Sequence, residues 1–406
     1  MTGDAPFGRL VTEKHMLSGL AVAYGTADWA ERHFFGSRSE VKEVNGRFVP
    51  DARPLDEDSL FDLASLTKLF TCVALLQLME RRCLRMADTI GGVDERFKRL
   101  GGVSLYDAMS YRVSLQSDER LDRQTDGERL RALIFSVHAE KTAGARVYSD
   151  MNALVLKYIV EKAAGCRFED YLQKAILEPL GLRNTLSRVP EPFRARCVNY
   201  NYEHRWSGGA IIVDRAALQG LPHDPKARVA MALGLGVSGH AGLFASLDDM
   251  VLFAQGLLSG RLVSPETLRL IGLNRTGYLR PNGDYRQFMG LLCFSKSPVQ
   301  RLSELPSWMG RSAFGLSGYT GNHIAIDPDL GVFDLMLGNR CHNRLSRVSP
   351  EADERLFGLS ADGSGLARLE DGRKVYASCR YVYLKDALFH RPVYVRLCEK
   401  GKLKCR

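Results

Sequence analysis

The feature that most constrains this chain is a segment, residues 69–79, that is apolar almost all the way round a helix. A helix without a polar face is buried on every side, and this one is too short to cross a bilayer, so it must form in a globular core. Ser65 and Lys68 stand at its start, one helical turn apart on the same face. A lysine on a buried helix is costly unless it is paired or has lost its proton. A neutral lysine beside a serine is a base beside a nucleophile, so nucleophilic catalysis is one interpretation of this spacing.

The same spacing also has ordinary structural explanations. Ser65 could cap the helix, and Lys68 could run its stem along apolar surface to water. The spacing recurs at Ser39 and Lys42, in a polar stretch with no buried helix behind it, and there we assign it no function. Taken alone, the pair at 65 and 68 favours the structural explanation, so the rest of the chain has to decide.

Composition places the chain among globular proteins with more than one lobe. It has 406 residues, of which 45% are hydrophobic and 25% are charged, enough to bury a large core. The nine cysteines are odd in number and show no CxxC spacing, which indicates free thiols rather than a zinc ribbon or a disulfide framework. The N-terminus lacks the basic and apolar regions of a signal peptide, so we expect a cytoplasmic protein with no membrane partner.

The positive charge is concentrated near the C-terminus. The net charge is +9, and residues 373–406 hold ten Lys/Arg and two acidic residues, so the rest of the chain is close to neutral. A basic segment with interleaved tyrosines could bind nucleic acid or another polyanion. A short pair of strands with a solvated basic face explains it more simply, and we expect no nucleic-acid partner.

Strand-like segments occur at both ends of the chain and helix-like segments in the middle. The pattern predicts strands at residues 18–24, 32–35, 322–326 and 332–337, and helices at residues 150–164, 168–177 and 247–258. This order predicts an α+β fold: an antiparallel sheet built from both chain ends and flanked by helices, with a helical lobe at roughly 80–200 inserted. We expect one domain over residues 1–350, an active-site cleft between its lobes, and a basic C-terminal appendage over residues 351–406.

Five stretches, taken in order, resemble the serine β-lactamase-related hydrolases, a family that includes class C β-lactamases, D,D-peptidases, esterases and D-aminopeptidases. The stretches are residues 61–68, 148–150, 167–182, 239–249 and 314–328. Each motif is modest alone, but five in the family's order make the resemblance strong over residues 16–345. The resemblance implies the β-lactamase and transpeptidase fold.

The resemblance also implies a role for each motif residue. Ser65 is expected to attack a carbonyl carbon and form an acyl-enzyme. Lys68 and Tyr148 are expected to move its proton, and which of the two acts as the base stays open. Because Ser65 begins a helix, its own backbone N–H can help to hold the oxyanion. By resemblance, the second N–H donor is that of Tyr319.

Three positions depart from the family's pattern and bear on substrate binding. The motif in residues 314–328 is called the third motif, after those at Ser65 and Tyr148. In the family it usually begins with Lys or His, but here it reads Leu316, Ser317 and Gly318, so the cation that would bind a substrate carboxylate is missing. Asp150 stands where relatives often have Asn, and its negative charge repels anions and favours a protonated catalytic lysine. Arg112 stands where relatives often have a His-Thr-Ser-Gly loop, and it could bind an anion.

Other histidines and glycines give weaker signals. His223 with Asp224, and His240, could form a metal site or a Ser-His-Asp triad, but the chain has no GxSxG elbow and no HExxH motif. We expect these histidines and His342 to be structural, and we expect no metal. Because the chain has no phosphate-binding glycine motif, we expect no cofactor either.

The sequence therefore supports three hypotheses. The first is a cytoplasmic serine hydrolase that cleaves a small-molecule ester or amide through an acyl-enzyme, most simply an esterase. The second keeps the chemistry and changes the substrate, giving a D-aminopeptidase, a D,D-peptidase or a β-lactamase. The third is a binding module on the same fold with weakened catalysis, and the retention of Ser65, Lys68 and Tyr148 argues against it.

Overall fold

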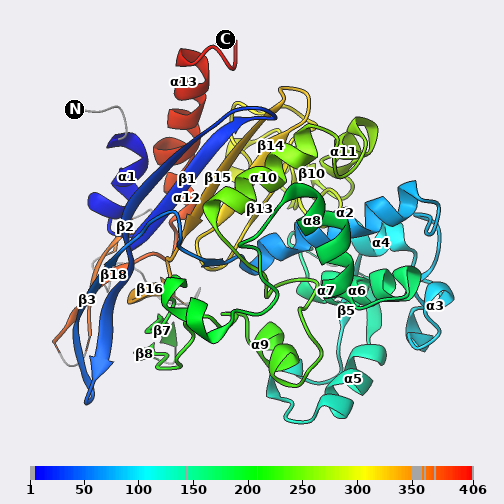
Figure 1. The fold of residues 1–406 in the computed structure, drawn as a ribbon, viewed down its shortest axis with the longest axis horizontal. Coiled ribbons are helices and arrows are strands. Elements are labelled where there is room, and N and C mark those ends of the chain that lie inside the picture. Colours follow the sequence, from blue (N-terminus) through cyan, green and yellow to red (C-terminus); the bar gives the residue numbers. More distant parts are fainter. Residues whose placement is uncertain are drawn as a thin grey trace.

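The computed structural model describes residues 5–141, 144–207, 209–348, 359–360, 363–369 and 372–404. Its helices are α1 Ala5–Thr12, α2 Thr67–Glu80, α3 Ile90–Val93, α4 Leu105–Met109, α5 Gly127–Phe135, α6 Asp150–Ala164, α7 Phe168–Leu172, α8 Glu178–Leu180, α9 Pro225–Ala232, α10 Leu247–Leu258, α11 Pro265–Ile271, α12 Val382–Lys385 and α13 Arg391–Glu399. Tight 3-10 or π-helical turns include η1 Ala64–Leu66, η4 Gln173–Leu177 and η8 Asp386–His390. The apolar segment forms α2, which is buried along almost its whole length and packs against α6 and α7 (Figure 1).

A seven-stranded antiparallel sheet is built from the two ends of the chain. Its order is β12-β13-β14-β15-β1-β2-β3. The strands of this sheet are β1 Gly19–Thr26, β2 Ala30–Val44, β3 Arg47–Pro54, β12 Phe294–Ser295, β13 Phe314–Ser317, β14 His323–Asp327 and β15 Val332–Gly338. β1 pairs with β15, with Leu20 opposite Gly338, so the two chain ends meet in the middle of the sheet. The predicted fold class is confirmed, and three of the four predicted strands agree with the observed ones to within two residues; the fourth is part of the longer β2.

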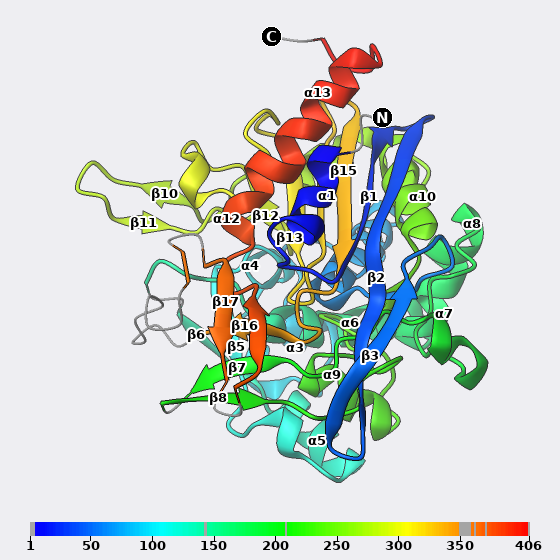
Figure 2. The ribbon, with the colours of Figure 1, turned by 90° about the vertical axis from the view of Figure 1, so that its left-hand side faces the viewer.

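Side chains of β1 alternate between two hydrophobic cores, one on each face of the sheet. Ala21 and Ala23 belong to the larger core, with α2 and α10. Leu20 and Val22 belong to the second core, with α1 and α13. Figure 2 shows α1 and α13 in front of the sheet, on the face opposite the helical lobe.

The remaining strands form small sheets around this centre. They are β4 Phe61–Asp62 with β9 Phe244–Ala245, β5 Val113–Gln116 with β6 His138–Lys141, β10 Tyr278–Leu279 with β11 Tyr285–Arg286, and a five-stranded sheet of β17 Gly365–Arg368, β18 Lys374–Ala377, β16 Arg344–Arg347, β7 His204–Ser207 and β8 Ala210–Val213. The β4–β9 pair positions the start of α2, because β4 leads into it through η1.

Local signals predicted two helices with their observed bounds. α6 ends where Gly165 adopts φ +68°, the left-handed C-terminal cap that the sequence predicts. α10 begins where Ser246 accepts the N–H of Asp249, the predicted N-cap. The helix predicted at 168–177 is helical throughout, but its second half is the π-helical η4.

Among its described residues, the C-terminal segment 351–406 contains the β17–β18 strand pair and a helical stretch in which α12, η8 and α13 follow one another directly. In β18, Lys374 and Tyr376 are exposed while Val375 and Ala377 are buried, so this part agrees with the expected strand pair. After it, α12, η8 and α13 pack on the second core. The boundary predicted at 349–350 lies outside the described residues, and the division into domains stays a prediction.

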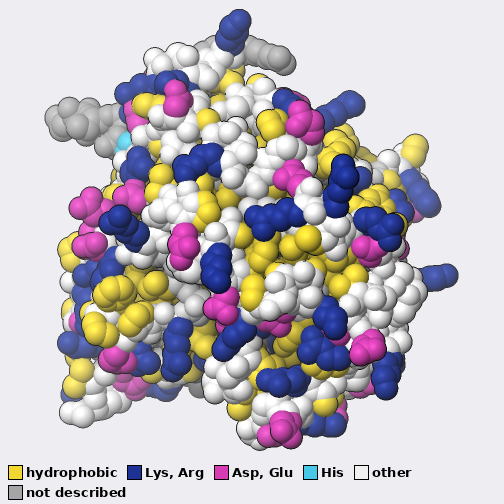
Figure 3. Space-filling view, turned by 45° about the vertical axis from the view of Figure 1, so that its right-hand side comes forward, with side chains coloured by type: hydrophobic (Ala, Val, Ile, Leu, Met, Phe, Trp, Pro, Cys, Tyr) yellow, Lys and Arg dark blue, Asp and Glu magenta, His cyan; other side chains and the backbone are white. Residues whose placement is uncertain are grey.

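The surface carries charges of both signs. Figure 3 shows Lys and Arg side chains interspersed with Asp and Glu over one face of the molecule. All eight cysteines in the described ranges are free, as predicted. Within the same ranges, no helix has the length and apolar character that crossing a membrane requires.

Candidate active site

Ser65 lies in a tight turn between a strand and the central helix. β4 leads into η1, which contains Ser65 and continues directly into α2. The preceding residue, Ala64, has φ +46°, a left-handed conformation that costs a non-glycine residue about 1–2 kcal/mol. The buried carboxylate of Asp62 holds this turn: it accepts the N–H of Ala64 at 2.9 Å and the N–H of His223 at 2.6 Å. The turn leaves the Ser65 side chain half-buried at the start of α2.

Lys68 is fully buried and contacts Ser65 directly. Its Nζ lies 2.9 Å from Ser65 Oγ and 2.8 Å from Asp150 Oδ1. It also donates to the carbonyl oxygen of His240 at 3.3 Å. Burial alone would lower the pKa of Lys68, but the negative charge of Asp150, with a smaller contribution from Tyr148, outweighs burial and raises that pKa above its usual range. Lys68 is therefore an ammonium at neutral pH.

Tyr148 lies against this ammonium. Lys68 Nζ is 4.7 Å from the ring centroid of Tyr148, and the rings of Tyr111 and Phe294 each pack at 5.6 Å from it. Burial raises the pKa of the Tyr148 phenol, and the nearby Lys68 and Ser65 only partly oppose this, so the phenol is protonated at neutral pH. Its buried hydroxyl makes no well-formed hydrogen bond to any residue that the structure describes. Because an unpartnered buried hydroxyl is costly, this one is available to a substrate atom.

A series of alternating charges leads away from Lys68. Asp150 Oδ2 accepts from Lys226 Nζ at 3.1 Å, and Lys226 also contacts Asp224 at 3.3 Å. Asp224 in turn lies 3.0 Å from His240 Nε2. Burial acts to raise the pKa of both carboxyl groups, but the surrounding cations hold the pKa of Asp150 and of Asp224 well below the usual range. Sequence reasoning identified Asp150 and missed Lys226. The signal that could have pointed to Lys226 is its position two residues after Asp224, at the start of α9.

The third-motif strand lies against the Ser65 turn. A Cβ atom at Gly318 would be 3.1 Å from the carbonyl oxygen of Leu63 and 3.5 Å from the Cβ of Ala64, so only glycine fits here without a shift. The next residue, Tyr319, donates its hydroxyl to Glu203 at 2.7 Å, and the Arg340 guanidinium lies 4.5 Å from its ring centroid. The geometry thus brings all three predicted motifs, at Ser65, Tyr148 and Gly318, to one place.

The sequence as a whole matches a known family. The model of the beta-lactamase family matches residues 9–355. The chain belongs to the beta-lactamase family. It is therefore a member of a family of serine hydrolases, as the resemblance of its motifs implies.

Individual relatives and solved structures agree with this assignment. A candidate D-alanyl-D-alanine carboxypeptidase of Escherichia coli (strain K12) is 25% identical over 332 residues, which are 74% of this chain and 73% of that protein. Simvastatin synthase (LovD) from Aspergillus terreus superposes with a TM-score of 0.63 over 98% of both chains at 17% identity. EstCE1, a hydrolase with promiscuous acyltransferase activity, superposes with a TM-score of 0.60 over 82% of this chain and 91% of its own at 17% identity. The two structural matches show that this beta-lactamase-family chain shares its fold with both.

The side chains of the first two residues of the third motif, Leu316 and Ser317, are both engaged in contacts within the protein. Leu316 is fully buried in the larger core. Ser317 is half-buried and donates its hydroxyl to Glu304 at 2.9 Å. Sequence reasoning missed Glu304, because it lies in a loop thirteen positions before Ser317 and carries no motif of its own.

The loop around Arg112 reaches the site through a different residue. Arg112 is exposed, and its guanidinium lies 4.8 Å from the ring centroid of Tyr106. Its neighbour Tyr111 has φ +57°, is fully buried and packs on Tyr148. An anion-binding role for Arg112 stays a prediction, whereas Tyr111 is a site residue that the sequence did not identify.

Three clusters of side chains bring possible metal-ligand atoms within 4.8 Å of one another in the described ranges. They are Asp150/Asp224/His240, Glu203/His223/Cys341 and His323/Asp334/His390. In the first, the ammonium groups of Lys68 and Lys226 already balance the two carboxylates. In the second, burial opposes the charged imidazole, but Cys341 and Glu203 raise the pKa of His223 to about 10, so an ion pair forms without a metal. The expectation that the protein needs no metal stays a prediction.

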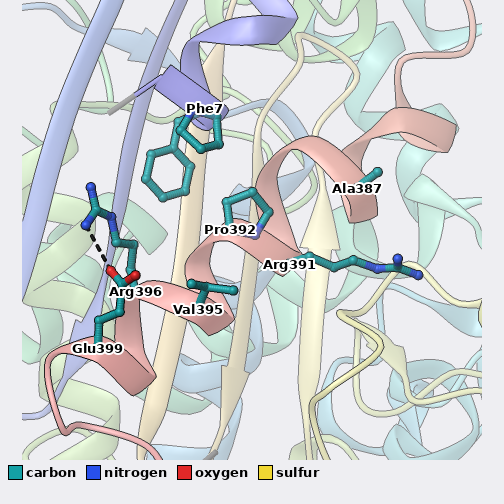
Figure 4. A pocket seen from close by; sticks show the side chains of 8 residues that line it. Phe7, Ala387, Arg391, Pro392, Val395, Arg396 and Glu399 are labelled. Atoms are coloured by element: carbon teal, nitrogen blue, oxygen red, sulfur yellow. Dashed lines mark hydrogen bonds and ion pairs between the residues drawn. The ribbon is translucent and has the colours of Figure 1, made fainter. Parts of the chain in front are cut away.

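A cavity of about 470 Å³ lies on the other face of the sheet, between α1 and the C-terminal helices (Figure 4). It is lined by Pro6, Phe7, Ala387, Arg391, Pro392, Val395, Arg396 and Glu399. None of these residues belongs to the Ser65 site, so this cavity says nothing about catalysis. The active-site cleft between lobes stays a prediction.

Proposed function

We propose that this chain is an esterase-type serine hydrolase that cleaves small esters, or small amides, through an acyl-enzyme on Ser65. The observation that carries the proposal is the contact between Ser65 Oγ and the fully buried Lys68 Nζ at 2.9 Å, with Asp150 and Tyr148 beside it. The competing structural explanations for this pair are a cap and a solvent-reaching lysine. Neither accounts for it, because Ser65 caps no helix and Lys68 is 0% exposed.

The mechanism begins with attack of Ser65 Oγ on the substrate carbonyl carbon. The negative charge that develops on the carbonyl oxygen would be held by the backbone N–H groups of Ser65 and Tyr319. Lys68 is an ammonium at rest, so it can take the Ser65 proton only as it passes one of its own on. The proton would pass through the Tyr148 hydroxyl to the leaving group, which departs as a neutral alcohol or amine, whether or not the proton rests on Asp150 on the way. Water then cleaves the acyl–Ser65 ester by the same steps in reverse order.

The choice of substrate follows from the charges around the site. Position 316 supplies leucine where relatives supply a cation, and Lys226 is already paired with Asp150 and Asp224. A substrate carboxylate would therefore find no unpaired cation among these groups, which favours uncharged esters over β-lactams and peptidoglycan peptides. The similarity to a candidate D-alanyl-D-alanine carboxypeptidase supports the second hypothesis, a D,D-peptidase, D-aminopeptidase or β-lactamase. A cytoplasmic location remains part of the proposal.

Labelling with a fluorophosphonate probe, followed by a panel of aryl esters, tests the proposal. The wild type should be labelled at Ser65 and should hydrolyse neutral esters, and Ser65→Ala should abolish both. Ser39→Ala is the matched control, because Ser39 has the same spacing to a lysine in β2 and should change neither. Labelling that persists in Ser65→Ala would overturn the assignment. Labelling without any turnover would favour the binding-module hypothesis, and turnover of β-lactams alone would favour the second hypothesis.

A further inference from the structure

Lys385 reaches the third-motif strand from the outer face of the sheet. Its Nζ lies 3.2 Å from Ser317 Oγ, 3.0 Å from His323 Nδ1 and 3.3 Å from Glu304 Oε2. The Lys385 side chain is only 3% exposed. The segment 351–406, which the sequence presents as a basic appendage, thus places one buried lysine directly behind the motif. Burial lowers the pKa of Lys385, and the carboxylate of Glu304, which favours the ammonium, opposes this shift.

These neighbours engage the only proton of the Ser317 hydroxyl. Its single proton goes to Glu304 Oε2 at 2.9 Å, and its oxygen accepts from the Lys385 ammonium. Burial and the adjacent ammonium hold the pKa of His323 well below its usual range, so His323 is neutral and accepts from Lys385 through Nδ1. A hydroxyl has only one proton to give, so Ser317 has none left for a substrate carboxylate.

Glu304 adds a negative charge at the same point. Its side chain is 30% exposed, whereas its partner Lys385 is 3% exposed, so water and substrate meet the carboxylate rather than the ammonium. Glu304 contacts the strand at Ser317, and the adjoining Gly318 abuts the Ser65 turn. The carboxylate therefore lies beside the strand along which we take the acyl group to lie. An anionic acyl group would meet a like charge and no free side-chain donor on Leu316 or Ser317.

We propose that Glu304, held in place by Ser317 and Lys385, is a charge filter that admits esters with a neutral acyl group and excludes those with a carboxylate on the acyl group. This inference rests on the proposed function, since it takes the acyl group to lie beside the third-motif strand. It gives Glu304 a role in specificity and Lys385 a positioning role.

The experiment compares two esters of similar size, p-nitrophenyl butyrate and mono-p-nitrophenyl glutarate, after subtraction of the rate with Ser65→Ala. The quantity measured is the ratio of their kcat/KM values. Glu304→Gln should reduce the preference for butyrate about tenfold, which corresponds to a repulsion of about 1.4 kcal/mol between the Glu304 carboxylate and the glutarate carboxylate. The change should appear in the KM for glutarate. Glu266→Gln, an exposed position on α11, is the matched control and should leave the ratio unchanged.

A second variant tests the positioning role. Lys385→Met removes the counter-ion of Glu304, so the preference for butyrate should rise several-fold above that of the wild type. Removing both groups in Glu304→Gln/Lys385→Met should bring the preference back below the wild-type value. If thermal melting shows that Lys385→Met does not fold, the ratio of kcat/KM values measured with Glu304→Gln still tests the proposal. An unchanged ratio in Glu304→Gln, or equal losses for the two esters, overturns the proposal, because equal losses indicate a structural role only.

A binding measurement separates this inference from the proposed function. If the wild type turns over neither ester, the proposed esterase activity is refuted. The filter is then tested with phenylboronic acid and 3-carboxyphenylboronic acid, which add reversibly to a nucleophilic serine. Glu304→Gln should improve the affinity for the carboxylated boronate about tenfold relative to the neutral one. Equal shifts for the two boronates would overturn the charge filter whether or not the protein is a hydrolase.

Discussion

Replacing Asp150 by asparagine should move the pH dependence of catalysis to lower pH. Asp150 is the strongest of the influences that keep Lys68 charged, and its carboxylate also raises the pKa of the Tyr148 phenol. Whichever group takes the Ser65 proton does so more readily once its own proton has left, so kcat/KM rises with pH through the pKa of that group. Asp150→Asn removes the negative charge, lowers both pKa values and therefore shifts the acidic limb downward, whichever of the two is the base.

The magnitude follows from the distance between the two charges. At 2.8 Å between Lys68 Nζ and Asp150 Oδ1, an effective dielectric constant of about 20 gives about 6 kcal/mol, or about 4 pKa units. The Asp150 side chain is 30% exposed, so water screens part of this interaction. We expect the acidic limb to move down by about 2 pH units, half of the unscreened value.

Lys226→Met provides the opposite perturbation. Lys226 contacts Asp150 at 3.1 Å and repels Lys68, so its removal strengthens the pairing of Lys68 with Asp150. The acidic limb should then move up, by about 0.5–1 pH unit because the effect is indirect.

The assay for both variants is the pH profile of kcat/KM for a neutral aryl ester followed up to about pH 11, because the pKa values of Lys68 and Tyr148 are both raised and the wild-type rise lies at high pH. Below the midpoint of the limb, an upward shift is measured as a lower kcat/KM at a fixed pH. A downward shift in Asp150→Asn together with an upward shift in Lys226→Met supports the electrostatic argument. Shifts of the same sign in the two variants would refute it. Loss of activity at every pH in Asp150→Asn would instead identify the carboxylate as the proton acceptor itself.

Two further predictions concern Tyr148 and Leu316. Tyr148→Phe should lower kcat by about 10²–10⁴-fold, since it removes one general acid–base group. In the double variant with Lys68→Met, the loss of kcat should be far smaller than the product of the two single losses, because the two residues act as one unit. Single-turnover rates measure these losses, and a near-normal kcat in Tyr148→Phe would show that Tyr148 is a packing residue only. Leu316→Lys should shift kcat/KM toward carboxylate-bearing esters by about 1–3 kcal/mol, the scale of a hydrogen bond to a charged group. Because Leu316 is fully buried, the variant should also melt at lower temperature, and Leu316→Met is the control for that loss. Equal changes for neutral and anionic esters in Leu316→Lys would show that the new ammonium does not reach the acyl group.

The parts of the fold that the sequence predicted well are those fixed by local chemistry. α6 and α10 have their predicted bounds because Gly165 ends one and Ser246 caps the other. β2 is longer than predicted, since most of its side chains are only half-buried and the strand lacks a clean apolar alternation. The π-helical η4 was not predicted, because such a turn is set by packing rather than by composition.

The residues of the candidate site also form two groups, those that local sequence motifs identify and those that they do not. Ser65, Lys68, Tyr148 and Asp150 stand in short motifs that could be recognised in the sequence by their resemblance to the family's motifs. Glu304, Lys226 and Lys385 come from segments with no such pattern, and only the tertiary fold brings them to the motifs. A pairing between residues 68 positions apart, such as Lys385 with Ser317, leaves no periodic signal in a single sequence.

The departures from the family pattern at positions 150 and 316 agree with the arrangement of charges around the site. Lys68 and Lys226 are both paired with Asp150, and Lys226 reaches Asp224 as well. Lys385, on the opposite side of the third-motif strand, is paired with Glu304. To pair with one of these lysines, an anionic substrate would have to displace a carboxylate from its ammonium partner, and doing so at a buried pair costs more than a solvent-exposed contact returns. A neutral ester disturbs none of them, so the loss of the cation at position 316 is matched by carboxylates that occupy the lysines near the site.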